Sequence, residues 1–170
     1  MRSSTRGCAP LRERPGVRHT RSGFTLIEIL VVLSIVGILA ALATIRYRDF
    51  AERARVARAV VELKSLETEV RVWSAERNDE LPASLAAAGI SPPNDPWGNP
   101  YRYLRIVQQG PGSTLGQARK DRFLVPINSD FDLYSVGRDG LTKPTLHHKD
   151  SRDDVVRAND GAFIGLAERF

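Results

Sequence analysis

The sequence predicts an α+β fold, in which one long N-terminal helix packs on a small antiparallel β-sheet. Three observations predict it. Residues 24–45 form a run of 22 residues that is apolar except for one charge, Glu28. Residues 46–77 continue with apolar side chains at helical spacing. Short alternating segments, bounded by proline and glycine, then follow between residues 78 and 170, as is typical of strands in a globular head.

The apolar run has the length of a membrane span. At ~1.5 Å per residue, a helix over it would be about 33 Å long, against about 30 Å for a bilayer core. A cleaved signal peptide has an apolar core of only about 7–15 residues, with its cleavage site after that core. A plain membrane anchor accounts for the length of the run. It does not account for Glu28, because an unpaired carboxylate is costly inside a membrane.

The second part of the helix is amphipathic. An apolar stripe at spacings of three and four residues comprises Val56, Val60, Leu63, Leu66, Val70 and Trp73. Asn78, Asp79 and Pro82 predict the end of the helix, and Gly37 is the only candidate for a break within it.

After the helix, the sequence predicts a small sheet connected by loops. Residues 81–90 read as a loop and a short helix that ends at Gly89. Four prolines between residues 92 and 100 exclude a helix or a central strand there. Strands are predicted over residues 101–107, 122–127 and 131–136.

The net charge of +5 does not indicate a nucleic-acid partner. Residues 1–22 alone contain six arginines and one glutamate, and the remaining chain has 19 basic and 19 acidic residues. The arginines between residues 46 and 58 are interrupted by Asp49 and Glu52, which favours a solvated face near lipid headgroups. The single cysteine, Cys8, leaves residues 24–170 without a thiol and therefore without a disulfide.

The junction before the apolar run carries a family resemblance. The basic residues Arg18 and Arg21 precede Gly23, Phe24 and, four residues later, Glu28. This pattern resembles the class III signal of type IV pilins and pseudopilins. The resemblance implies that a prepilin peptidase removes residues 1–23, or a shorter leader if translation starts at Val17, and methylates Phe24. Residues 24–45 would then serve as the membrane-spanning and polymerising half of the helix, with residues 46–77 as its amphipathic half.

Two further motifs narrow the resemblance. The segments 95–101 (DPWGNPY) and 131–140 (FDLYSVGRDG) are similar to the G-type major pseudopilins of type II secretion. That family implies a homopolymer in the periplasm that supports export of folded proteins. Its partners would be minor pseudopilins, an inner-membrane assembly platform and, before assembly, the lipid bilayer. A type IV pilus or competence pilin is the alternative, and a membrane-anchored periplasmic binding or enzyme domain is a second one.

The same resemblance implies a calcium ion in the C-terminal loop. Hard cations bind six to eight oxygens, which clustered aspartates and carbonyls can supply. The candidate ligands are Asp139, Asp150, Ser151, Asp153 and Asp154. His147 and His148 are adjacent and would point to opposite sides of an extended chain, so they read as a surface pair. The sequence contains no nucleophile elbow, P-loop or dinucleotide fingerprint, and an enzyme is not expected.

Overall fold

The computed structural model describes residues 23–170. The predicted leader therefore lies outside the described residues, apart from Gly23. The chain divides into two compact units, residues 1–43 and 44–170. One α-helix, α1 (Leu26–Ala75), begins in the first unit and ends in the second.

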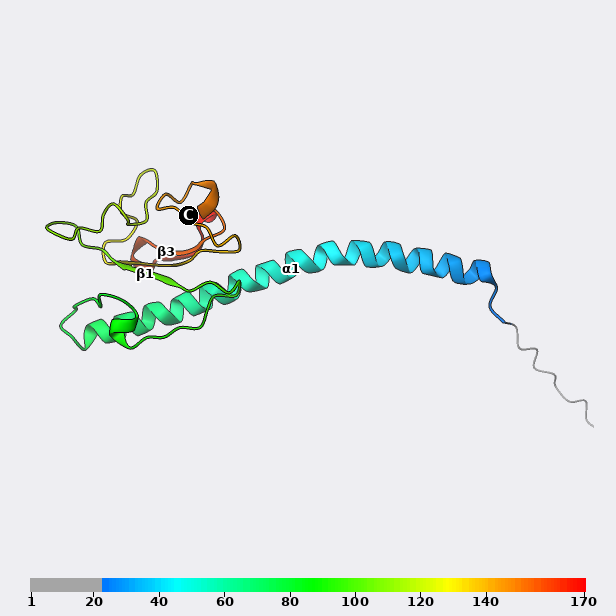
Figure 1. Cartoon of the computed structure of the whole chain (residues 1–170), viewed down its shortest axis with the longest axis horizontal. Coiled ribbons are helices and arrows are strands. Elements are labelled where there is room, and N and C mark those ends of the chain that lie inside the picture. Colours follow the sequence, from blue (N-terminus) through cyan, green and yellow to red (C-terminus); the bar gives the residue numbers. More distant parts are fainter. Residues whose placement is uncertain (1–22) are drawn as a thin grey trace, which may run out of the picture. The chain divides into compact units, whose positions relative to one another are not determined.

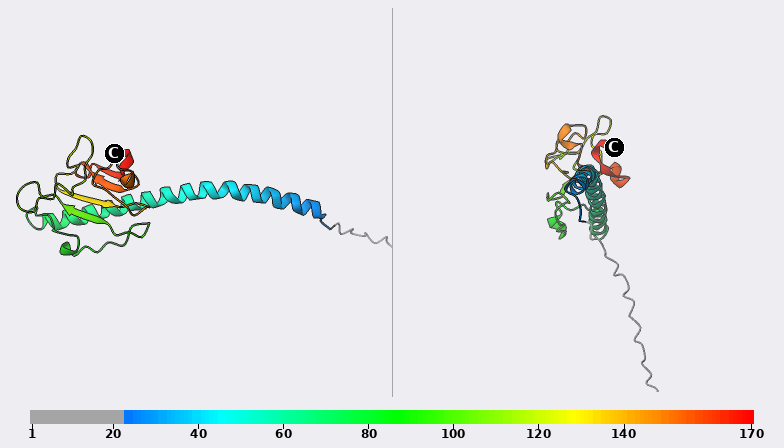
Figure 2. Two further views of the ribbon diagram at one scale, coloured as in Figure 1. Left: turned by 45° about the horizontal axis from the view of Figure 1, so that its top comes forward. Right: turned by 90° about the vertical axis from the view of Figure 1, so that its right-hand side faces the viewer.

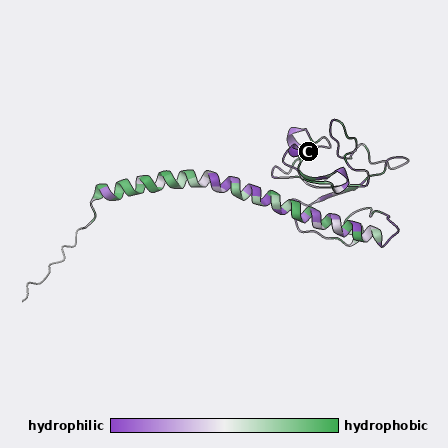
Figure 3. Ribbon diagram, turned by 180° about the vertical axis from the view of Figure 1, so that it is seen from behind, coloured by the Kyte–Doolittle hydropathy of each residue, from purple (hydrophilic) through white to green (hydrophobic). Residues whose placement is uncertain are grey.

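The described part of the first unit is the apolar half of α1. Its large apolar side chains are exposed, and among the described residues α1 is long and apolar enough to cross a membrane by length and composition. Figure 3 shows this part as an almost continuous hydrophobic ribbon, followed by a segment in which hydrophobic and hydrophilic residues alternate. The helix continues through Gly37 without interruption.

Within the second unit, α1 ends close to the predicted position. Asn78 and Asp79 have positive φ angles of 52° and 63°, which no α-helix tolerates. The amide of Asp79 donates to the carbonyl of Ser74 at 3.0 Å and so closes the last turn. A short 3₁₀ helix, η1 (Ala86–Ala88), follows and is closed by Gly89 at φ 73°, as the sequence predicts.

The sheet is a four-stranded antiparallel meander in the order β1-β2-β3-β4. Its strands are β1 (Arg102–Arg105), β2 (Phe131–Ser135), β3 (Val155–Ala158) and β4 (Phe163–Leu166). Tyr103 lies opposite Leu133, and Val155 lies opposite Leu166. The sheet lies alongside the second part of α1 (Figures 1 and 2).

Alternation along the strands gives the sheet two buried faces. Phe131, Leu133 and Val155 pack against the apolar stripe of α1, including Leu63 and Val70, and form the main core. The opposite face carries a smaller cluster, covered by loops, that comprises Ile127, Leu146, Val156, Ala158 and Ala167. The predicted α+β architecture is confirmed.

One predicted strand is wrong, and two strands were not predicted. Residues 122–127 form an irregular segment in which Phe123 is 90% exposed and the amide of Asp121 donates to Leu124. Pro126 has no amide hydrogen to contribute to a ladder. β3 does not show the alternation of apolar and polar residues that predicts a strand, because it is buried along its whole length and contains Arg157. β4 has only four residues, one of them glycine, which is too short a segment for the alternation to be recognised.

Candidate functional site

The segment around Gly23 is built as an exposed entry to α1. The hydroxyl of Thr25 accepts a hydrogen bond from the amide of Glu28 at 3.3 Å and thus caps the helix N-terminus. Phe24, immediately before it, is 79% exposed. A Cβ atom built on Gly23 would meet nothing within 4 Å, and its φ is not in the left-handed region. The folded chain itself therefore does not require glycine at position 23.

Glu28 is exposed on the apolar half of α1. Within residues 23–170, no cation forms an ion pair with its carboxylate. Its immediate neighbours, Ile27 and Ile29, are exposed apolar residues. Glu28 can therefore accept a positive charge from outside the described chain, and it needs one if water is excluded.

The two head motifs form one hydrogen-bonded unit. The Asp95 carboxylate accepts the amides of Trp97 and Asn99 at 3.1 and 2.7 Å, and the hydroxyl of Ser135 at 2.5 Å. The Asn99 side chain donates to the carbonyl of Gly137 at 3.0 Å. The proline-rich loop is thus fixed to the end of β2, although about 40 residues separate the two segments in sequence.

A buried ion network joins α1 to the sheet. Arg157 of β3 donates to Glu67 at 3.0 Å and, through both terminal nitrogens, to Asp130 at 2.8 and 2.7 Å. Lys64 and Arg71 contact the same Glu67 carboxylate at 2.7 and 3.2 Å. Burial alone would raise the pKa of Glu67, but the hydrogen bonds from these cations lower it below its ordinary value.

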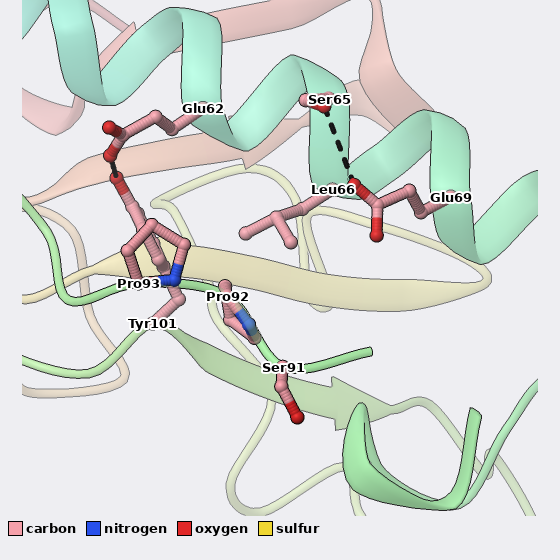
Figure 4. Close-up of a pocket in the computed structure, with 8 residues that line it drawn as sticks. All are labelled: Glu62, Ser65, Leu66, Glu69, Ser91, Pro92, Pro93 and Tyr101. Atoms are coloured by element: carbon pink, nitrogen blue, oxygen red, sulfur yellow. Dashed lines mark hydrogen bonds between the residues drawn. The ribbon is translucent and has the colours of Figure 1, made fainter. Parts of the chain in front are cut away.

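Glu62 of α1 forms a second polar link to the head (Figure 4). The Tyr101 hydroxyl donates to the Glu62 carboxylate at 2.5 Å. Burial, together with this carboxylate, raises the pKa of Tyr101 and keeps the hydroxyl protonated. The cavity beside the pair measures about 170 Å³ and is lined partly by Pro92 and Pro93. It is a small gap between helix and loop, in which the exposed hydroxyl of Ser65 donates to Glu69 of the same helix at 3.5 Å.

The five candidate calcium ligands lie in the loop between β2 and β3, and three of them have internal roles. Asp153 accepts the amides of Arg138 and Asp139 at 2.9 and 3.0 Å. The Ser151 hydroxyl bridges the amide and carbonyl of Lys143 at 2.8 and 2.9 Å. Asp154 is fully buried and bound by the guanidinium of Arg119.

The remaining two candidates, Asp139 and Asp150, serve local turns. Asp139 is exposed and accepts the amide of Leu141 at 2.8 Å, while Asp150 lies 3.5 Å from His148. His147 instead contacts Asp121 at 2.6 Å, so the two histidines have different partners, as a surface pair would.

This donor set fits a calcium ion poorly as it is arranged. Over residues 23–170, no group of three or more histidine, cysteine or acidic side chains is placed to hold a metal. One buried acceptor is left over, because oxygen Oδ1 of Asp154 makes no hydrogen bond. Burial raises the pKa of Asp154 to about 6 even though Arg119 opposes that shift. Calcium binding stays a prediction.

Residues 18–44 match the prokaryotic N-terminal methylation motif. Type II secretion system core protein G of Pseudomonas aeruginosa is 32% identical over 143 residues, covering 72% of this chain and 87% of that protein. The chain belongs to the type IV pilin-like family. A fimbrial protein of Neisseria meningitidis serogroup B is 28% identical and covers 86% of this chain and 85% of its own. Core protein G of Aeromonas hydrophila is 29% identical over 72% of this chain and 87% of its own.

As a member of the type IV pilin-like family, the chain is a non-enzymatic structural protein. Membership implies polymerisation and processing by a prepilin peptidase, and the methylation motif with its apolar helix is consistent with an inner-membrane pilin. The sequence-predicted residues Gly23, Phe24 and Glu28 all fall inside the matched motif.

Sequence reasoning missed the buried arginines of this pilin-like head. Arg119 and Arg157 are among the largest fully buried side chains, although arginine is rarely buried unless paired. A weak signal was available for Arg157, because it follows two valines in an otherwise strand-like segment. Nothing in the sequence around Arg119 indicates that its partners lie in a loop that ends 35 residues later.

Proposed function

We propose that the chain is the major, G-type pseudopilin of a type II secretion system. It polymerises through the apolar half of α1 into a periplasmic fibre that supports the export of folded proteins. Its other partners are minor pseudopilins, the inner-membrane assembly platform and the prepilin peptidase.

The hydrogen-bonded unit formed by the two head motifs carries this proposal. Asp95 and Asn99 are hydrogen-bonded to Ser135 and Gly137, so the two motifs that resemble G-type subunits form one structural unit, which supports the proposal. The absence of cysteine from residues 24–170 agrees, because a pilus subunit more often carries a cysteine pair near its C-terminus.

The local geometry supports the proposal that the peptidase cleaves after Gly23. Because the folded chain has open space around Gly23, any demand for a small residue there comes from an external partner. A peptidase that binds the junction in a narrow active site imposes such a demand. Gly23→Ala should therefore be tolerated better than Gly23→Val.

Glu28 acts as the register mark of assembly. Cleavage after Gly23 creates a positively charged amine on Phe24, only one helical turn from Glu28. Within one chain the amine points along the helix axis, whereas the carboxylate projects sideways. A neighbouring subunit, staggered along the fibre, presents its Glu28 to the incoming amine, and the pair is neutralised as the apolar faces exclude water.

A deletion strain tests the proposed system. Removal of the chain should abolish the export of folded proteins and leave surface pili, twitching and DNA uptake intact, because the fibre stays in the periplasm. Plasmid-borne wild type should restore export. Lost pili with normal export would overturn the secretion assignment and establish the second candidate, a type IV pilin. The Neisseria fimbrial protein favours that candidate, since it covers more of this chain than core protein G does.

Mass spectrometry of the wild type and one variant, Glu28→Ala, test the roles of Gly23 and Glu28 in the same strain. Mass spectrometry of membrane-extracted wild type should show a chain that begins at N-methylated Phe24. Glu28→Ala should be inserted and cleaved normally but should assemble and export poorly. Glu76→Ala, which removes an exposed glutamate from the turn directly after α1, is the matched control. An intact leader on wild type would contradict the processing, and normal export by Glu28→Ala would contradict the register role.

A further inference from the structure

The loop between β2 and β3 closes around a buried arginine. Arg119 is 2% exposed and lies on the face of the sheet that points away from α1. Its amide donates to Asp132 of β2 at 2.6 Å, and its guanidinium lies 4.3 Å from the centre of the Tyr134 ring. Contacts with Asp132 and Tyr134 of β2 therefore hold Arg119 against the sheet, independently of its contacts with the loop.

The Arg119 guanidinium donates hydrogen bonds to two separate parts of the loop, residues 142–143 and residue 154. Nη1 donates to the hydroxyl of Thr142 at 2.5 Å and to the carbonyl of Lys143 at 2.8 Å. Nη2 donates to the carboxylate of Asp154, which also accepts the Thr142 hydroxyl at 2.6 Å. A carboxylate, a hydroxyl and a backbone carbonyl are the oxygen types that a hard cation would collect.

We infer that Arg119 supplies the cation that closes this loop, in the place that the family resemblance gives to calcium. The loop from Gly137 to Asp154 is consequently ordered without a metal ion. This inference concerns the head alone and does not depend on which secretion or pilus system the chain serves.

The bonding of the other candidate ligands supports this substitution. Oδ2 of Asp153 and the hydroxyl of Ser151 already bond to backbone groups of the same loop, so neither side chain can reorient toward an ion without breaking those bonds. A divalent ion on Asp154 would also lie beside the guanidinium, and the two positive charges would repel each other in a buried place.

Two buried atoms of the Arg119–Asp154 pair that make no hydrogen bond support the same conclusion. Nε of Arg119 and Oδ1 of Asp154 are buried and make no hydrogen bond. They are a donor and an acceptor from the same two side chains, and a bidentate arginine–carboxylate pair uses one of each. A bidentate arrangement of these two side chains would pair Nε with Oδ1 without an ion.

Thermal unfolding of the full chain in detergent micelles tests the inference. Protein freed of metal with a chelator is compared with protein in millimolar calcium, and magnesium serves as the control for ionic strength. The tryptophan signal reports only the head, because Trp73 and Trp97 are the two tryptophans of the chain. Equal melting temperatures are expected. An ion in roughly hundredfold excess over its Kd would raise the melting temperature by roughly 5–10 °C, and that result would overturn the inference.

Hydrogen exchange localises the effect. Arg119→Gln should accelerate amide exchange across residues 137–154, whereas Arg122→Gln, an exposed arginine nearby, should not. Thr142→Val removes only the hydroxyl that links Arg119 to Asp154, and it serves as the test variant if Arg119→Gln does not fold. Unchanged loop exchange in both Arg119→Gln and Thr142→Val would contradict the role of the guanidinium. So would loop protection in wild type that requires calcium.

Discussion

Leu33 and Leu63 lie in the same helix, but Leu33 is 66% exposed whereas Leu63 is fully buried. Around Leu33 the helix is apolar on every side, and no other element of the described first unit covers it. Around Leu63 the helix is amphipathic, and its apolar stripe meets Phe131 and Leu133 of the sheet.

The two halves of α1 also place glutamates differently. Glu67 is 2% exposed and has three cations of its own chain around it. Glu28 stands on an apolar surface, and residues 23–170 supply no ion pair to it. The second half of α1 thus finds its apolar and ionic partners inside the chain, and the first half must find both outside it. That division is the physical basis of a polymerising subunit that carries a globular head.

The largest expected effect on head stability distinguishes substitution of Leu63 from substitution of Leu33. Leu63→Ala should lower the free energy of unfolding of the head by about 3 kcal/mol, because a buried side chain is replaced by a cavity. Leu33→Ala should leave head unfolding unchanged and should reduce fibre assembly instead. Chemical denaturation followed by tryptophan fluorescence measures the first effect, and the yield of sheared fibres measures the second. Equal destabilisation of the head by the two variants would remove the distinction between the halves.

Glu67→Gln should have the next largest effect, about 2 kcal/mol off the stability of the head, because one buried partner of Arg157 loses its charge. Asp130 still pairs with Arg157 and limits the loss. The matched change Glu28→Gln should leave head stability as it is.

The pH dependence of stability checks the same network. The pKa of Glu67 is lowered in the folded head, so its stabilising contribution is complete above the ordinary glutamate pKa and is lost as the pH falls through the lowered value. Wild type should therefore lose stability more steeply than Glu67→Gln when acidified below about pH 4.5. Parallel acid profiles would mean that the ion network contributes little.

The smallest expected change in head stability is for an exposed ion pair on the surface of α1. Arg55 contacts Glu52 at 3.3 Å, and about half of the Arg55 side chain is exposed. Arg55→Ala should change head stability by less than about 0.5 kcal/mol, since exposed ion pairs are screened by water and salt. Denaturation at low and high salt measures it, and a loss comparable to that of Glu67→Gln would show that exposure is not what separates these pairs.

The sequence by itself determined the features that depend on local pattern. Helical periodicity from Val56 to Trp73 predicted the second half of α1 and the side that packs. The Gly23–Glu28 junction predicts the processing and assembly residues. Alternation found β1 and β2, and Gly89 marked the end of the short helix. Each of these signals lies within a few neighbouring residues, so no knowledge of distant contacts was needed.

Tertiary structure alone decided the features that depend on distant partners. Arg157 lies in β3 because Glu67 and Asp130 neutralise it there, and Arg119 is buried because a loop 20 to 35 residues later encloses it. Residues 122–127 look like a strand, but no neighbouring strand pairs with them, and Phe123 remains in solvent. Whether a charge is buried or a strand is paired is decided by groups far away in sequence, because desolvation and hydrogen bonding depend on the final neighbours.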